Sequence, residues 1–103
     1  MIAYVYDGEN LAGELSLEDN IYSFVYNENF LKSHRAISLT LPKQKEPFNS
    51  PHLHPFFANL LAEGNLKKLQ CKKLKIDEDD EFMRLVKTAT DDTIGTVTIR
   101  EKL

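Results

Sequence analysis

The side chains in this sequence that could carry chemistry are three histidines, a single cysteine and a short run of acids. A zinc site would have to draw its ligands from His34, His52, His54 and Cys71. His52 and His54 lie two residues apart in a proline-bounded segment, whereas Cys71 belongs to a predicted helix. Structural zinc sites place paired ligands on both sides of a loop. The spacing therefore favours a polar loop and a half-buried thiol over a metal centre.

Cys71 is also a candidate nucleophile, but a reactive thiolate needs a basic, partly open environment and an oriented histidine. Lys72 and Lys73 follow it directly, and no pattern in the sequence places a histidine beside the sulfur. The acids at residues 78–81 could pair for acid–base work, although acids at a helix start ordinarily serve capping and solvation. The glycines are too scattered for a phosphate-binding loop, at Gly8, Gly13, Gly64 and Gly95. We therefore predict a protein that is not an enzyme and that holds no metal or cofactor.

The composition is that of an ordinary soluble globular protein, with 42% hydrophobic and 28% charged residues. A chain of 103 residues predicts one domain over residues 1–103. A formal net charge of −3 argues against direct binding of nucleic acid, which normally needs a basic surface. The single cysteine, the lack of a signal-peptide pattern and the lack of an apolar run of about 18–20 residues predict a cytoplasmic protein without a membrane partner.

The elements that must position any site follow from the hydrophobic periodicity. Alternating apolar residues and turn signals predict strands at residues 2–6, 11–17, 21–26, 36–41 and 95–100. Tight turns at Asp7-Gly8 and Asp19-Asn20 join the first three strands into an antiparallel meander. Gly13 within the second strand indicates a bulge or a close backbone approach. The predicted fold class is α+β, an antiparallel sheet made of a meander plus further strands and packed with about three short helices.

The helices are expected mainly in the second half of the chain. Helical patterns cover residues 55–63, residues 65–73 and a segment after the predicted N-cap Asp77. Residues 27–34 form a turn or one short helix. The last predicted helix should face the core with Phe82, Leu85, Val86 and Ala89. Residues 42–55 contain four prolines and are predicted to form a loop.

Residues 54–66 form the segment on which the functional hypothesis depends. Pro55 suits the first turn of a helix, and apolar pairs four residues apart follow it, Phe56 with Leu60 and Phe57 with Leu61. We assign this aromatic half to the core. Gly64 can adopt the left-handed conformation that ends a helix, and Asn65 can cap the next one. Residues 62–65 are therefore predicted to form an exposed tip above a buried base.

Four short pieces of the sequence, taken in order, carry a family resemblance. They are residues 13–15 (GEL), 38–42 (SLTLP), 56–61 (FFANLL) and 92–98 (DTIGTVT). The series resembles the N-terminal subdomain of HipA-type serine/threonine kinases, which are toxins of bacterial toxin–antitoxin pairs. The resemblance runs from about residue 2 to residue 100, almost the entire chain.

A HipA kinase continues into nucleotide-binding and catalytic parts that have no counterpart before Leu103. A subdomain without them is similar to the HipS family, the small proteins of three-component HipBST systems. The resemblance implies an antitoxin that neutralises HipT, a truncated HipA-like kinase, by packing near its active site. It also implies that HipB, a DNA-binding protein, belongs to the same complex.

Two residues depart from the family pattern at the tip. Family members commonly have Leu-Leu-Pro where this chain has Ala62 after its two leucines, and some carry a large aromatic at the position of Asn65. Such an aromatic could plug a pocket of the partner, so this chain would use polar or backbone contacts instead. The predicted kinase contacts are Ala62, Glu63, Gly64 and Asn65, with flanking His54 and Lys68.

Two other hypotheses remain open at the level of sequence. The protein could be a scaffold or specificity module that positions a kinase against a substrate or a DNA-bound partner without inhibiting it. It could also be an independent enzyme that uses Cys71. A structural interpretation of the tip is open as well, in which Glu63-Gly64 only ends a helix and Asn65 only caps the next one.

Overall fold

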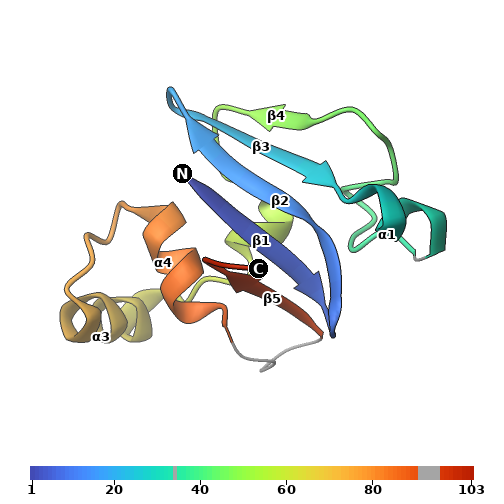
Figure 1. Cartoon of the computed structure of the whole chain (residues 1–103). Helices are drawn as coiled ribbons and strands as arrows, with labels where there is room; N and C mark the ends of the chain where they lie inside the picture. The colour runs from blue at the N-terminus through green and yellow to red at the C-terminus, as the bar shows by residue number, and fades with distance from the viewer. Residues whose placement is uncertain (34, 91–95) are drawn as a thin grey trace.

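The computed structural model describes residues 1–33, 35–90 and 96–103, and its centre is an antiparallel sheet (Figure 1). The strand order is β4-β3-β2-β1-β5. The strands are β1 (Ile2–Asp7), β2 (Asn10–Glu18), β3 (Ile21–Tyr26), β4 (Phe48–Ser50) and β5 (Val97–Arg100). The helices are α1 (Glu28–Ser33), α2 (Pro55–Ala58), α3 (Gly64–Leu74) and α4 (Glu81–Thr88). The predicted α+β class is confirmed, with four short helices in the described residues where about three were predicted.

Strands β1 to β3 form the predicted meander because both connecting turns contain residues with positive φ. Gly8 has φ of 62° in the first turn, and Asp19 and Asn20 have φ of 50° and 64° in the second. Such values match the right-handed twist of the strands that a two-residue turn connects. The β1–β2 register changes between Val5 and Tyr6, so the bulge predicted near Gly13 is present.

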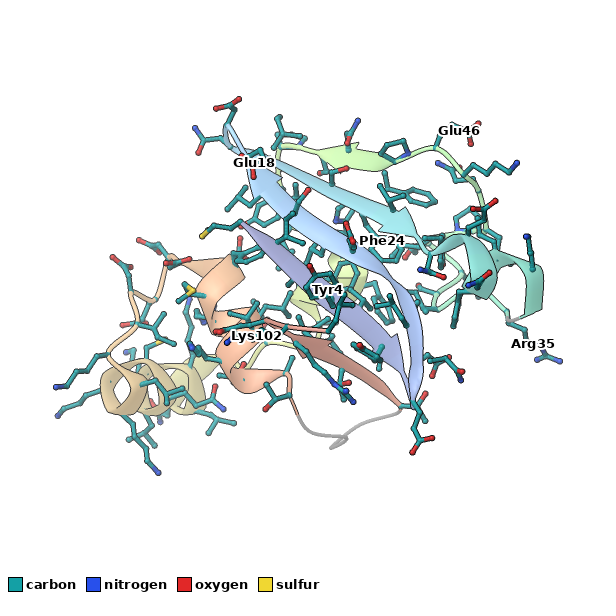
Figure 2. The ribbon with its side chains drawn as sticks, in the orientation of Figure 1. Tyr4, Glu18, Phe24, Arg35, Glu46 and Lys102 are labelled. Carbon is teal, nitrogen blue, oxygen red and sulfur yellow. The ribbon has the colours of Figure 1, made fainter. Side chains whose placement is uncertain are left out.

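The core lies on one face of this sheet. Phe24, labelled in Figure 2, lies on β3 and has no exposed surface. Its ring makes edge contacts with Phe57 at 5.4 Å and with Tyr26 at 4.9 Å between centroids. The yellow-green α2 lies behind the sheet in Figure 1, which brings Phe57 to this face. Burial of each such ring stabilises the fold by roughly 1.5–3 kcal/mol.

The prediction of a strand at residues 36–41 is wrong. This segment contains one isolated bridge, between Ser38 and Leu41, and Leu39 is fully exposed. The hydroxyl of Tyr26 donates to the carbonyl of Leu41 and accepts from the amide of Ile37 at 3.1 Å, so a side chain replaces a strand ladder. Burial raises the pKa of the Tyr26 phenol, which keeps the donor protonated.

The outer side of β3 pairs with β4, which lies inside the segment predicted as a loop. Its register places Ser50 opposite Tyr22 and Phe48 opposite Phe24. Three residues between Pro47 and Pro51 are too few to give a periodic signal. The pairing adds a further strand to the edge of the meander and places Phe48 beside the core.

Capping residues fix where the last helix begins. The side chain of Asp80 accepts from the amide of Met83 at 3.1 Å and caps α4, whereas Asp77 accepts from Asp79 at 2.8 Å within the preceding turn. The predicted N-cap was therefore three residues too early. The apolar face of α4 is buried as predicted, with Phe82, Leu85, Val86 and Ala89. Helix α1 at Glu28–Ser33 agrees with the short helix that was one of the two possibilities for residues 27–34, and His34 lies outside the described residues.

Candidate partner-binding site

The base of the site is α2, which is shorter than predicted. Pro55 occupies the first turn, and the amide of Asn59 donates to its carbonyl at 3.0 Å. The next bonds run over three residues instead of four, from Leu60 to the carbonyl of Phe57 and from Leu61 to that of Ala58. This tightening ends the helix at Ala58, five residues before the predicted end.

The aromatic half of the segment is only partly core. Phe57 has no exposed surface, whereas Phe56, Leu60 and Leu61 are half-buried and pack against the core. Asn59 is exposed. A helix of four residues cannot direct residues 56, 57, 60 and 61 to the same side, so the predicted pairs four residues apart do not both form a buried stripe.

The predicted tip is exposed, and its backbone is defined. Glu63, Gly64 and Asn65 are exposed, and Ala62 is half-buried. Gly64 has φ of 61°, the left-handed conformation predicted for it, although it stands at the start of α3 and not at the end of α2. Glu63 occupies the N-cap position, so the prediction that Asn65 caps the helix is wrong. The carboxylate of Glu63 makes no capping hydrogen bond, and the residue is exposed.

A hydrogen bond from the Arg84 side chain fixes the backbone of the tip. This α4 side chain is 5% exposed, and its Nη2 donates to the carbonyl of Ala62 at 2.7 Å, with a longer contact of 3.5 Å from Nη1 to the carbonyl of Glu78. A charged donor makes a hydrogen bond roughly twice as strong as a neutral one. The guanidinium therefore fixes where the chain leaves α2 and enters α3.

Sequence reasoning missed Arg84 for a geometric reason. Residue 84 lies on the side of α4 away from Phe82, which the helical period assigns to solvent. It is buried because a segment 22 residues earlier in the chain covers it. Local periodicity contains no signal for such a contact.

Replacing Arg84 by methionine is expected to loosen the tip. The lost charge-assisted bond to the Ala62 carbonyl is worth about 1.5–3 kcal/mol. Amide exchange at residues 63–67 should therefore accelerate by roughly 10- to 100-fold, which hydrogen–deuterium exchange measures. Lys87→Met is the matched control, since Lys87 lies on the same helix, is exposed and pairs with Glu101 at 2.6 Å. Equal exchange at the tip in the two variants would contradict the anchoring role.

His54 requires a correction. Its side chain is 6% exposed, so the prediction that it contacts a partner beside the tip is wrong. Nε2 lies 2.7 Å from the carbonyl of Phe48, which makes Nε2 the protonated nitrogen, and the ring makes an edge contact with Phe57. His54 instead joins β4 to the start of α2. Lys68 is exposed on α3, one turn beyond the tip, as the hypothesis requires.

The other chemically suggestive residues do not converge in the described part of the chain. His52 is exposed, and Cys71 is buried on α3. Among residues 1–33, 35–90 and 96–103, no group of three or more His, Cys, Asp or Glu side chains could hold a metal ion. None of the helices described is long and apolar enough to cross a membrane.

A family model described as the HipA N-terminal domain matches residues 3–100. The chain belongs to this family. A solved structure titled "N-terminal domain of HipA toxin" superposes with a TM-score of 0.70 at 30% sequence identity, over 99% of this chain and 94% of that one. The likeness thus extends over the sheet, the base and the tip.

In two relatives, the region that matches this chain makes up very different shares of the protein. An uncharacterized protein of Haemophilus influenzae is 35% identical over 81 residues, which are 79% of this chain and 74% of the relative. A protein of Sinorhizobium fredii named "Putative kinase Y4dM" is 30% identical over 87 residues, 76% of this chain. The matched region is only 21% of that second protein.

The four pieces of sequence that carry the resemblance to the HipA N-terminal domain lie in different elements of the structure. Residues 13–15 belong to β2, residues 38–42 include the isolated bridge beside Tyr26, and residues 56–61 form α2 and the turns after it. Of the last piece, residues 92–95 lie outside the described residues, Thr96 precedes β5, and residues 97–98 belong to β5. The three fully described pieces therefore reflect folding more than binding, and the tip follows the third of them directly and includes the first residues of α3.

Proposed function

We propose that this protein is an antitoxin, and not itself an enzyme, that binds and neutralises a truncated HipA-like serine/threonine kinase of the HipT type. The proposal extends its membership of the HipA N-terminal domain family. The observation that carries it is the exposed turn of Glu63, Gly64 and Asn65, held in place by the buried Arg84. The turn would pack at the mouth of the kinase active site.

The physical argument for this role is preorganisation. The Arg84 bond and the left-handed Gly64 define the turn before any partner arrives. A rigid surface loses less conformational entropy on binding than a flexible loop does. The free Glu63 carboxylate suits a basic residue of the kinase, and the amide of Asn65 offers donors and an acceptor where an aromatic plug would offer neither.

The relatives support a role that depends on a kinase. One relative is named as a kinase and contains the matched region as about a fifth of its length. In the Haemophilus relative the matched region is 74% of the protein. We propose that this chain supplies the domain to a separate kinase and that a HipB-like DNA-binding protein joins the complex.

The double variant Glu63→Lys with Asn65→Ala is expected to bind the kinase about 10- to 100-fold more weakly than the unchanged protein, because the charge reversal repels a basic partner residue. The measurement is titration against a truncated HipA-like kinase of the HipT type, combined with an autophosphorylation assay. The unchanged protein should suppress autophosphorylation, and the variant should not. In cells, the variant should fail to rescue growth from kinase toxicity.

A matched control is available in the β1–β2 turn, where Glu9 and Asn10 are also exposed next to a glycine with positive φ. Glu9→Lys with Asn10→Ala should bind and rescue as the unchanged protein does. Full rescue and undiminished binding by the tip variant would exclude the tip as the contact. Tight binding of the unchanged protein without any loss of autophosphorylation would favour the scaffold hypothesis instead.

A further inference from the structure

Helix α3 presents leucines to solvent. Leu66, Leu69 and Leu74 are 56%, 65% and 44% exposed. The buried residue of this helix is Cys71, and Leu69 points to nearly the opposite side because successive residues turn by roughly 100°. Figure 1 shows α3 farther from the sheet than α4, at the edge of the molecule. Leu66 and Leu69 lie roughly 60° apart around the helix and share its outward surface, whereas Leu74 lies on the flank nearer Cys71. An adjacent pair of exposed leucines is more than the fold itself requires.

The same helix carries only positive charge. Residues 64–75 contain no acid and five lysines, Lys67, Lys68, Lys72, Lys73 and Lys75. The side chains of α3 radiate outward with nitrogen tips in Figure 2. Two ion pairs of the described residues, Met1 with Glu18 and Lys87 with Glu101, involve none of these lysines.

Helix stability explains only part of this charge. Lys72 and Lys73 lie in the last turn, where a cation interacts favourably with the helix dipole. Lys67 and Lys68 follow the first turn of α3, where the helix dipole gives a cation no stabilisation. The helix dipole therefore accounts for Lys72 and Lys73 but not for Lys67 and Lys68.

We propose that the leucine and lysine surface of α3 is a second contact with the kinase, and that it takes an acidic protein surface with an apolar centre. The inference rests on the proposed function for the identity of the partner. Two observations support it: α3 begins at the tip itself, at Gly64, so both contacts are continuous, and the positive charge of residues 64–75 is complementary to an acidic surface. The tip supplies a specific polar contact, and α3 supplies apolar area and electrostatic steering.

Two other occupants fit less well. An anionic membrane would attract the lysines but repel the five acids of residues 77–81, which follow α3 directly. The helix also lacks the aromatic residues that are typical of interfacial helices. Pairing of α3 with α3 of a second copy would bring two sets of five lysines together.

The test separates the apolar from the ionic contribution. Leu66→Ala with Leu69→Ala should weaken kinase binding about 10- to 100-fold, with little dependence on salt. Lys72→Glu with Lys73→Glu, two turns away from the tip, should lower the association rate about tenfold at low salt, and high salt should reduce this difference. All four residues are exposed, so circular dichroism should show folded variants. The matched controls are Leu39→Ala and Lys43→Glu with Lys45→Glu, exposed residues outside α3, which should bind normally.

Each outcome decides between the hypotheses. Failure of the unchanged protein to bind the kinase would overturn both the proposed function and this inference. Binding of the unchanged protein together with full binding of both α3 variants would overturn the inference alone. The inference is also overturned if the unchanged protein, but not the α3 variants, sediments with vesicles of phosphatidylserine and phosphatidylcholine. A concentration-dependent dimer that the α3 substitutions abolish would overturn it in favour of self-association.

Discussion

Gly13→Ala is expected to lower the free energy of unfolding by about 3 kcal/mol, at the upper end of the usual cost of overpacking a core. A Cβ atom at this position would overlap the backbone carbonyl oxygen of Val25 and would lie 2.9 Å from two ring carbons of Phe24. The carbonyl belongs to the neighbouring strand and cannot rotate away. Relief would require the β2–β3 pair to separate beside the β-bulge.

Urea denaturation measures this loss, and Gly8→Ala is the control. Gly8 has φ of 62°, and a Cβ atom added there would meet no heavy atom within 4 Å. Alanine at this position therefore costs only the left-handed conformation, about 1 kcal/mol. The difference between the two variants isolates the steric contribution at Gly13. Equal losses would show that β3 moves freely and would contradict the close approach.

The sequence predicted the elements whose signals are local. Strands β1 to β3 were predicted within one residue because alternation and two-residue turns act over a few neighbours. Residues 36–41 alternate just as regularly, but β4 pairs with the outer side of β3 in their place. The competition between these two segments depends on a contact of Tyr26 with Leu41 and on the pairing of β3 with the distant β4. The hydrophobic periodicity of a segment carries no information about either of these long-range contacts.

The candidate site was likewise predictable from the sequence only where the signals are local. Exposure of Glu63 to Asn65 and the conformation of Gly64 follow from residue type and turn chemistry, and both predictions are confirmed. The burial of His54 depends on the carbonyl of Phe48 in the strand that was missed, and the role of Arg84 depends on a contact between distant segments. The residues that contact solvent were therefore easier to predict than those that hold them in place.

Phe57→Ala is expected to cost about 3–5 kcal/mol, the loss typical of a fully buried aromatic side chain. Its ring touches Phe24 on the sheet at 5.4 Å and His54 at 5.8 Å between centroids, so truncation leaves a cavity between α2 and the sheet. A domain of this size should lose roughly 4–8 °C of melting temperature for each kcal/mol. Differential scanning calorimetry measures the shift, and Phe57→Leu, expected to cost less, keeps the comparison possible if the alanine variant does not fold.

Phe56→Ala separates the loss of an aromatic ring from the loss of the core contact. Phe56 lies beside Phe57 on the same short helix, at 5.3 Å between ring centroids, but is only half-buried. We expect it to cost less than half as much as Phe57→Ala, since the hydrophobic contribution scales with the area removed from water. Equal costs would mean that both rings belong to the core. Because α2 leads directly to residues 62–65, Phe57→Leu should also weaken kinase binding more than Phe56→Ala if the core sets the position of the tip.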